Sequence, residues 1–509
     1  MKTCTRRFAL LFLLTIWLAN TYGQAGAIDV NFGENGYLKA NFDNTGGHFS
    51  SIMTQQDGKI VAVGNTLHDV EVKRFLPNGQ KDTQFGNNGT KIIEDFNTYS
   101  TAGGLSPEGK ILAIYVGYGN SPSSSKVVKI VRLLPNGNLD TSFGSNGTTT
   151  LDVPGMLDVL SDKVYFLPTG EIVFAGGTLN ISYPELKVIK LKSNGSLDAS
   201  FGENGVLKLP VNNGFSKLRT SFQLPNRLVL ATSRDNHNWI TVYRIFDNGS
   251  KDPSFGDNGK KEIYYQDPIM VGGVLGLDNG QIALAASNGQ YGATYNYYLS
   301  MLQNNGEPAA SFGNDGIAAV NMNEPALATG LAKQSDGKFL IGGMTGLGDG
   351  EDYSITRVGA DGSVDHSFGS LGIAKTFDNN GDHCSTTMTL QGNGKILIGG
   401  FSTYGQASMA RYLTENANGV DEIEVGISNA LIYPNPTTGA ALVKFNLAKS
   451  ETTTLSLLDA VGRTIWTEKT YRLQGMNEQA LPMQDLPAGI YFVKIQTETG
   501  TATQKIEKS

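Results

Sequence analysis

The chain is poor in cysteine, and this excludes stabilisation by an internal disulfide in the exported protein. Its two cysteines are Cys4 and Cys384, and Cys4 lies in an N-terminal stretch that we predict is removed on export. One thiol remains, so no intramolecular disulfide can form. His383 precedes Cys384, but no second cysteine, asparagine or aspartate stands in a supporting arrangement. We therefore predict a half-buried structural thiol rather than a catalytic or metal-binding one.

Long hydrophobic runs are also missing beyond the start of the chain. Phe8–Ala19 is apolar and follows three basic residues, a pattern typical of a secretory signal. We predict a signal peptide over residues 1–23, cleaved between Gly23 and Gln24. The run is too short for a comfortable transmembrane helix, and no later stretch has the required length.

Basic charge and metal-ligand spacing are scarce as well. The chain has 40 Lys and Arg against 47 Asp and Glu, which argues against a nucleic-acid partner. The five histidines are scattered, and no nucleophile-elbow motif occurs. Oxygen ligands alternate over residues 377–382 as in a calcium loop, but the twelfth position holds Thr389 rather than Glu. We predict no catalytic residue, cofactor or metal, with calcium at this loop or at Gly348–Asp352 as the alternative.

What the chain does contain is a motif repeated seven times, Phe-Gly-x-x-Gly. Successive motifs are 53, 58, 58, 54, 57 and 56 residues apart. A period this regular indicates an array of one supersecondary unit. The seven motifs begin at Phe32, Phe85, Phe143, Phe201, Phe255, Phe312 and Phe368.

Each unit carries four candidate strands separated by turn signals. In the first unit we expect them at Tyr37–Phe42, Phe49–Thr54, Lys59–Gly64 and Val70–Leu76. Four antiparallel strands in each of seven units indicate an all-β fold, a seven-bladed β-propeller over residues 24–413.

The repeat is out of phase with the ends of this region. The last unit stops after Ala410–Leu413, before its Phe-Gly motif, whereas the region begins with that missing piece, Ile28–Gly33. The simplest account is ring closure, in which the N-terminal segment completes the blade that the last unit leaves unfinished.

A basic residue and an aspartate recur at fixed places in the units. We predict that they pair within each blade, and that the last pair forms across the ring closure. The fifth unit lacks both, having Met301 and Ala309 instead. The alternative is that each aspartate only caps a turn through its own backbone. Either role is structural, and an exposed pair would contribute only about 0–1 kcal/mol. The predicted pairs are Arg74–Asp82, Arg132–Asp140, Lys190–Asp198, Arg244–Asp252, Arg357–Asp365 and Arg411–Asp29.

The chain changes character after the last unit. Residues 414–428 are polar and predict a linker, and residues 429–509 contain about seven short strands. This number of strands in about 80 residues predicts a small immunoglobulin-like β-sandwich.

The repeated unit resembles the bacterial delta-60 repeat. The resemblance rests on Leu139–Gly144 and Gln56–Ile60 and on their sevenfold recurrence. The fourth unit departs from the pattern at Leu224–Arg227, where the glycine of the turn is lost. Members of that family are taken to form β-propellers, and the family has no assigned activity.

The tail resembles the type A C-terminal sorting domain of the type IX secretion system of Bacteroidota. The resemblance implies that the protein crosses the outer membrane, is recognised by the type IX machinery through this tail, and is cleaved in the linker. The propeller would then be released or attached at the cell surface. The matching residues are Tyr433, Pro434, Asn435, Pro436, Gly439, Gly462, Arg463, Gly489, Tyr491 and Lys494.

These observations favour a secreted or surface-displayed binding module for an extracellular glycan or protein, without enzymatic activity. The alternatives are a hydrolase or lyase with carboxylates at the propeller channel, and a structural surface-coat protein. One stretch is rich in tyrosine, which could stack on sugars or pack between blades. Its members are Tyr264, Tyr265, Tyr291, Tyr295, Tyr297 and Tyr298.

Overall fold

A computed structural model describes most of residues 24–509. The exceptions are 43–45, 67–68, 95–97, 119–125, 152–158, 168, 179–183, 212–213, 224–225, 290–294, 347–349, 377–382, 403–405, 416–426, 448–449, 460–461, 474 and 498–500. The predicted signal peptide, the first candidate calcium loop, Tyr291 and most of the linker therefore lie outside the described residues. No helix of the described part is long and apolar enough to cross a bilayer.

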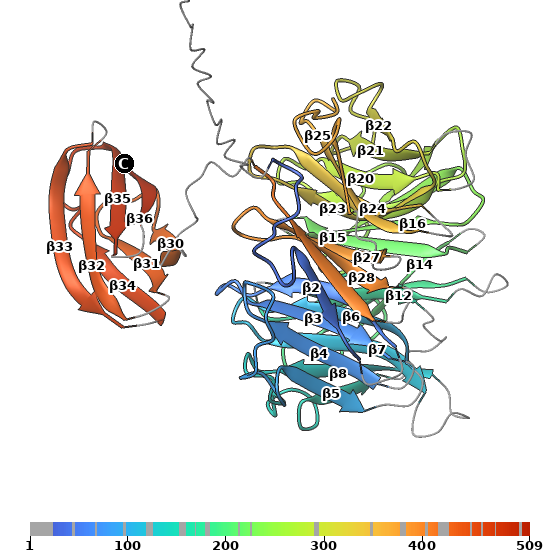
Figure 1. Ribbon diagram of the computed structural model, residues 1–509, viewed down its shortest axis with the longest axis horizontal. Helices are drawn as coiled ribbons and strands as arrows, with labels where there is room; N and C mark the ends of the chain where they lie inside the picture. The colour runs from blue at the N-terminus through green and yellow to red at the C-terminus, as the bar shows by residue number, and fades with distance from the viewer. Residues whose placement is uncertain are drawn as a thin grey trace, which may run out of the picture.

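Seven antiparallel sheets form the propeller, and each sheet is one blade (Figure 1). From the inner to the outer strand, blade 1 has β2 (His48–Thr54), β3 (Ile60–Asn65), β4 (Asp69–Phe75) and β5 (Thr90–Glu94); blade 2 has β6 (Thr98–Leu105), β7 (Ile111–Tyr118), β8 (Lys126–Leu133) and β9 (Thr148–Leu151); blade 3 has β10 (Val159–Leu160) with β11 (Tyr165–Phe166), β12 (Ile172–Gly177), β13 (Leu186–Leu191) and β14 (Val206–Leu209).

The remaining four blades follow the same order. Blade 4 has β15 (Lys217–Gln223), β16 (Arg227–Ser233), β17 (Trp239–Phe246) and β18 (Lys260–Tyr264); blade 5 has β19 (Met270–Gly276), β20 (Ile282–Ser287), β21 (Asn296–Leu302) and β22 (Ile317–Asn321); blade 6 has β23 (Ala326–Lys333), β24 (Phe339–Thr345), β25 (Asp352–Val358) and β26 (Ile373–Lys375); blade 7 has β27 (His383–Leu390), β28 (Ile396–Ser402), β29 (Ala407–Tyr412) and β1 (Tyr37–Ala40).

The second strand of each blade is buried because both of its faces pack against neighbouring blades. All six residues of β3 are buried, and its Val61 and Val63 share a core cluster with Ile111 and Ala113 of blade 2. A strand covered on both faces has an almost continuous apolar sequence, as this one does. The hydrophobic core is therefore distributed between blades around the ring.

The ring closes through the N-terminal segment, as the sequence predicts. The Asp29 N–H donates to the Arg411 carbonyl oxygen at 2.8 Å, and Ile28 forms an isolated bridge with Tyr412. In Figure 1 the blue strand β2 lies beside the orange strands β27 and β28. Closure therefore joins the first and last described segments of the propeller.

The predicted phase of the strands is wrong by one position. Tyr37–Ala40 does not open blade 1 but pairs with Ala407–Ala410 as the outer strand of blade 7. In every blade the strand after the Phe-Gly motif is the outer strand. The strand before the motif is therefore the third strand of its blade, and it is mostly buried, as β4 and β17 show. The seven-bladed architecture is confirmed; only the assignment of this strand to a blade changes.

The C-terminal part is a two-sheet β-sandwich, as predicted. One sheet contains β30 (Ile427–Tyr433), β31 (Ala441–Leu447) and β34 (Gly475–Leu481), and the other contains β33 (Thr464–Arg472), β32 (Glu451–Leu458), β35 (Gly489–Gln496) and β36 (Thr501–Lys508). A single core that includes Phe445, Leu457 and Val493 lies between them. Strand β30 begins at Ile427, two residues before the predicted start of this domain.

Candidate functional site

The structure brings each predicted base to its predicted acid. The contacts are Nε–Oδ2 contacts for the arginines and an Nζ–Oδ2 contact for the lysine. The distances are 2.8 Å for Arg74–Asp82, 2.9 Å for Arg132–Asp140, 3.4 Å for Lys190–Asp198, 2.8 Å for Arg244–Asp252, 2.9 Å for Arg357–Asp365 and 2.8 Å for Arg411–Asp29.

Each aspartate also caps its own turn, so the two alternatives hold together. Asp140 Oδ2 accepts from Arg132, while its Oδ1 accepts from the Ser142 N–H at 3.2 Å. The same division of the two oxygens occurs at Asp29, Asp82, Asp252 and Asp365. Both oxygens of each of these carboxylates therefore accept hydrogen bonds, as buried polar groups ordinarily do.

Each paired arginine also contacts the next blade around the ring. The Arg132 guanidinium lies 4.4 Å from the centroid of the Phe143 ring, and its Nη1 donates to the Ser193 carbonyl oxygen of blade 3 at 2.6 Å. Arg411 stacks on Phe32 in the same way and donates to the Pro77 carbonyl oxygen of blade 1. The Phe-Gly motif therefore supplies a ring for the arginine, and the arginine links two blades.

The paired side chains are only 0–14% exposed, and this corrects the expectation of exposed pairs. The side chains of Arg244 and Asp252 are 0% and 1% exposed. Burial by itself raises the pKa of Asp252, but hydrogen bonds from Ser254 and Arg227 and the charge of Arg244 outweigh it and lower that pKa to about 2. Removing one member of such a pair costs far more than breaking an exposed pair, because the other charge stays buried.

Blade 5 shows the apolar version of the same contact. Met301 and Ala309 replace the base and the acid, and both are 4% exposed. They pack with Phe312 in one core cluster. Blade 5 therefore packs an apolar pair where the other blades have an ion pair, so either kind of pair can occupy these two positions of the repeat.

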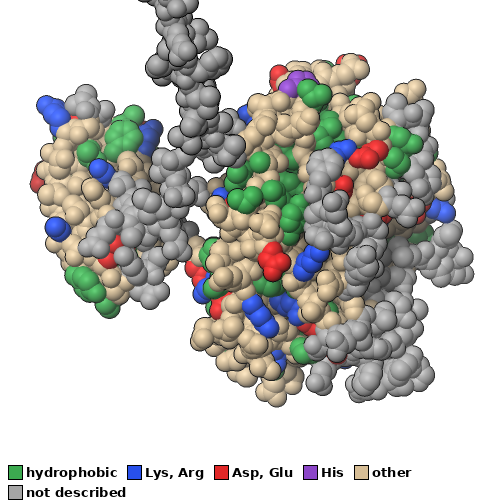
Figure 2. All heavy atoms as spheres, viewed as in Figure 1, with side chains coloured by type: hydrophobic (Ala, Val, Ile, Leu, Met, Phe, Trp, Pro, Cys, Tyr) green, Lys and Arg blue, Asp and Glu red, His purple; other side chains and the backbone are tan. Residues whose placement is uncertain are grey.

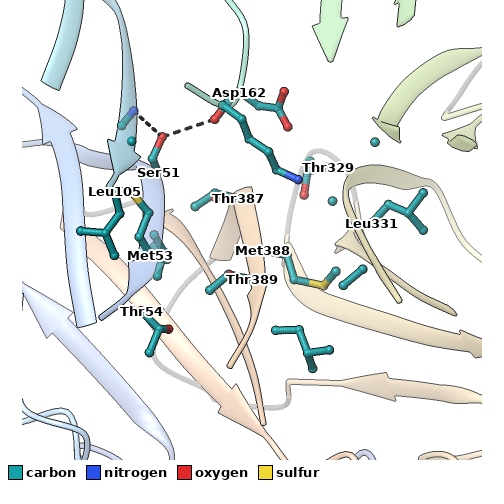
Figure 3. Close-up of a pocket in the computed structure, with 18 of the residues that line it drawn as sticks. Ser51, Met53, Thr54, Leu105, Asp162, Thr329, Leu331, Thr387, Met388 and Thr389 are labelled. Atoms are coloured by element: carbon teal, nitrogen blue, oxygen red, sulfur yellow. Dashed lines mark hydrogen bonds between the residues drawn. The ribbon is translucent and has the colours of Figure 1, made fainter. Parts of the chain in front are cut away.

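A cavity of about 500 Å³ lies on the axis of the ring, between the inner strands of several blades (Figure 3). Hydroxyl and apolar side chains line most of its wall. The hydroxyl groups come from Ser51, Thr54, Tyr165, Thr329, Thr386, Thr387 and Thr389, and the larger apolar groups from Ile52, Met53, Leu105, Val164, Leu275, Leu331, Met388 and Leu390. Two basic residues, Lys163 and Lys333, also line the cavity.

Part of blade 3 reaches into this cavity because its inner strand is interrupted. Between β10 and β11, Asp162 accepts a hydrogen bond from the Thr220 N–H at 3.1 Å, and its carbonyl oxygen accepts one from the Ser51 hydroxyl at 3.5 Å. Asp162 is the one carboxylate among the residues that line the cavity. Sequence reasoning missed this segment, although the weak strand signal around Ser161 distinguishes the third unit.

The other candidate residues have structural surroundings. Cys384 is 9% exposed, so it is buried rather than half-buried, and its thiol donates to the Glu351 carboxylate. The ring centroids of His383 and Tyr353 are 5.2 Å apart, with an interplanar angle of 38°. Among the described residues no group of three or more His, Cys, Asp or Glu could hold a metal ion. The loop at 377–382 lies outside the description, so calcium there stays a prediction.

The tyrosine-rich stretch divides into buried and exposed members. Tyr297 is fully buried and its hydroxyl group contacts the Ser354 hydroxyl at 2.8 Å. Burial raises the pKa of Tyr265 to about 12, although a hydrogen bond with Ser300 offsets part of the effect. These two pack between strands, whereas Tyr264 is 62% exposed.

The predicted sorting motif residues hold the C-terminal sandwich together. The Asn435 side chain accepts from the Glu507 N–H at 2.9 Å and donates to the Lys505 carbonyl oxygen at 2.9 Å. Tyr491 is 7% exposed, and its hydroxyl group donates to Pro487 at 2.8 Å. Arg463 is 81% exposed and pairs with Asp459 at 2.7 Å. Of these side chains, those of Asn435 and Arg463 are exposed at the surface, and that of Tyr491 is buried.

The seven further motif residues lie in turns, on strands or at the exposed surface. Gly462 has φ +84°, a conformation that glycine adopts without strain. Lys494 is half-buried on β35. The remaining members lie near the start of the sandwich or of β35: Tyr433, Pro434, Pro436, Gly439 and Gly489.

Two family models match parts of this chain. Residues 431–508 match the secretion system C-terminal sorting domain. Four stretches, 55–85, 107–143, 167–201 and 334–368, match a β-propeller domain of unknown function, DUF5122. Each of these stretches ends on the phenylalanine of a Phe-Gly motif.

Solved structures resemble the chain only in part. A catalytically inactive virginiamycin B lyase from Staphylococcus aureus has a TM-score of 0.43 at 12% identity, over 74% of this chain and 99% of that one. Polysaccharide lyase Uly1 has a TM-score of 0.41 at 12% identity, and the match covers 75% of this chain and 93% of that one. An α-L-arabinanase from Penicillium chrysogenum has a TM-score of 0.36 at 13% identity, over 63% and 94%. No curated protein matches the sequence.

Proposed function

We propose that this chain, a DUF5122-like β-propeller joined to a secretion system C-terminal sorting domain, is an exported binding module. The sorting domain marks proteins that are delivered to the cell surface or secreted, and it matches the type IX system. The propeller is then the cargo, and it meets extracellular glycans or proteins. Its role is to hold such a ligand without changing it chemically.

The observation that carries this proposal is the character of the axial cavity. Its volume of about 500 Å³ lies in the range of ligand sites. Threonine and serine hydroxyl groups such as those of Thr387 and Thr389 can both donate and accept hydrogen bonds, and leucine and methionine side chains supply apolar contact. Together with Asp162, Lys163 and Lys333, which also line the wall, this mixture suits recognition of a polar ligand.

The same cavity gives little support to the rival proposal of a hydrolase. General acid–base work on a glycosidic bond ordinarily needs two carboxyl groups, and the described wall supplies Asp162 alone. One oxygen of Asp162 is already bonded to the Thr220 N–H. Binding is therefore the function that these residues favour.

The test is direct binding by a chain of residues 24–509. We expect it to be retained on at least one immobilised extracellular polysaccharide or purified surface protein, and to leave that ligand uncleaved. In the variant Thr387→Val/Thr389→Val the cavity loses hydroxyl groups at nearly constant shape, so retention should weaken if the cavity contributes. Thr150→Val is the matched control, because Thr150 is exposed on the outer strand β9. Failure to retain any ligand, or release of cleaved products, would contradict the proposal.

A further inference from the structure

One blade carries an aromatic pair where the other blades have non-aromatic residues. Trp239 is the first residue of β17 and lies directly opposite Tyr264, the last residue of β18. Its position is five residues before the arginine of the pair. In blades 1, 2, 3, 5, 6 and 7 the same position holds Asp69, Val127, Glu185, Asn296, Asp352 and Gln406.

In blades 1, 5 and 7 the residue across from this position is also non-aromatic. Opposite Asp69 stands Glu94, and opposite Asn296 stands Asn321. In blade 7, Gln406 donates to Asn41 at 2.8 Å. A repeat array keeps equivalent positions similar unless one of them has a separate role, so the aromatic pair in blade 4 needs its own explanation.

The rings are arranged as an open surface rather than as a packed core. The Trp239 and Tyr264 ring centroids are 6.2 Å apart with an interplanar angle of 42°. The ring centroids of His237 and Trp239 are 4.5 Å apart, and the two rings are nearly perpendicular, with an interplanar angle of 87°. Tyr264 is 62% exposed, while Trp239 and His237 are half-buried. The indole is thus held from one side and accessible from another.

Hydrogen bonds hold this surface in place before any ligand arrives. The Tyr265 N–H donates to the Asn238 carbonyl oxygen at 2.7 Å, and the Asn238 side chain donates to the Tyr265 carbonyl oxygen at 3.0 Å. The Tyr264 hydroxyl group donates to Glu262 at 2.8 Å, and Lys260 donates to the same carboxylate at 2.8 Å. Preorganised rings lose little conformational entropy on binding.

The chemistry of this surface favours a sugar ring over a protein. Tyr264 is the one exposed large hydrophobic residue among the described residues of blade 4, so the surface lacks the contiguous apolar core that a protein interface needs. The charges of Glu262 and Lys260 are paired with each other, so they do not select an ionic ligand. Flat apolar rings beside polar groups match a pyranose, which has apolar C–H faces and a rim of hydroxyl groups.

We propose that Trp239 and Tyr264 form a stacking platform for a pyranose ring of a neutral extracellular polysaccharide. The proposal rests on the binding function above, and it adds to the axial cavity a second site and a ligand class for that site. The rings contact the C–H face of the sugar. Glu262 accepts from its hydroxyl groups, and Lys260 donates to them.

Tryptophan fluorescence tests the platform directly. In residues 24–509 the tryptophans are Trp239 and Trp466, so a chain carrying Trp466→Phe has Trp239 as its sole fluorophore. We titrate this chain with cellohexaose, xylohexaose, mannohexaose, laminarihexaose, maltohexaose and chitohexaose. At least one of these is expected to shift the Trp239 emission in a saturable way.

Variants of the exposed ring supply the second arm. In the same background, Tyr264→Ala should weaken that binding about tenfold, the loss of one aromatic contact, whereas Tyr264→Phe should retain most of it. Tyr264 is largely exposed, so the alanine variant is expected to fold. Phe401→Ala is the matched control, since Phe401 is an exposed aromatic residue of blade 7.

The outcomes separate this proposal from the binding function. If a sugar binds but neither the Trp239 emission nor the Tyr264→Ala affinity changes, the platform is wrong and the binding function stands. If the chain binds only proteins, the platform is again wrong. If nothing binds, both proposals fail. A saturable emission change with selective loss in Tyr264→Ala supports the platform.

Discussion

Arg411 Nε lies 2.8 Å from Asp29 Oδ2, although the two residues are 382 positions apart in the chain. The contact joins the last strand of the propeller to the segment that precedes the first, and both side chains are buried. One ion pair thus marks the point at which the ring closes.

We expect Arg411→Met to destabilise the propeller by about 3 kcal/mol, because Asp29 stays buried with a weakened set of partners. Lys395, which lies 3.2 Å from Asp29, keeps the cost from being larger. Urea unfolding of residues 24–509 measures the change. Asp57→Asn is the control, since Asp57 is exposed and pairs only with Lys59; equal effects in both variants would show that closure does not depend on this pair.

Blade 5 predicts how blade 4 responds to loss of its pair. The double variant Arg244→Met/Asp252→Ala reproduces the residues found at Met301 and Ala309, which fill the same place without ions. We expect Asp252→Ala to cost about 3–5 kcal/mol and Arg244→Met to cost less, because Asp252 keeps its 2.8 Å contact with Arg227. The double variant should cost less than the sum, because neither buried charge is left behind and the Arg227 side chain is 26% exposed. A double-mutant cycle by chemical unfolding gives the coupling energy, and strict additivity would contradict this account.

Acid should weaken the propeller through these carboxylates. The folded pKa of Asp252 is about 2, below the ordinary value of about 3.9, so the unfolded chain takes up the proton first as the pH falls. The stabilisation is complete above about pH 4 and is lost as the pH falls toward about 2. The pKa values of Asp140 and Asp365 are lowered in the same direction. Urea midpoints across this range should fall steeply, and less steeply in Asp252→Asn; equal slopes would count against the assignment.

Leu371 is a site where substitution should stabilise the protein. It has φ +54° and is 74% exposed, so it bears the strain of a left-handed conformation without burying its side chain. The equivalent residue in the other six motifs is asparagine or aspartate, with φ between 48° and 54°. We expect Leu371→Asn to raise the free energy of unfolding by about 1 kcal/mol. Leu139→Asn is the control, because Leu139 is also exposed (38%) and does not have a positive φ.

Removal of residues 427–509 should separate export from folding. The sorting domain has its own core, and no strand of its sheets pairs with a described propeller strand. We expect the shortened protein to fold yet to remain inside the outer membrane of a host with a type IX system. Fractionation and immunoblotting locate it. Arrival of the shortened protein at the cell surface would mean that the tail is not the address.

Much of the architecture could be predicted because its signals are local. The Phe-Gly motif recurs at an almost constant spacing, and glycine and asparagine take the positive φ values that its turn requires, as at Gly144 and Asn146. Figure 2 shows acidic and basic side chains interspersed on the visible face of the propeller, as the small net charge suggests. Such features follow from neighbouring residues in the chain.

The site was harder to predict because it depends on residues from several blades. Asp162 faces the axial cavity because the inner strand of blade 3 is interrupted between β10 and β11. Trp239 lies beside Tyr264 because of the register of β17 with β18. The tyrosine-rich stretch pointed to the region, but it could not separate exposed Tyr264 from buried Tyr297. Burial depends on the neighbouring blade, whose position a single unit does not specify.

The number of blades and the export tail could be predicted from the linear chain, because periodicity and motifs are properties of the chain itself, and the repeated ion pairs could be predicted with turn capping as the alternative. The blade to which each strand belongs, the burial of the pairs and the exposure of each aromatic ring became clear in the folded protein. These features arise from packing between segments brought together by ring closure, and packing energy depends on contacts that sequence distance does not encode.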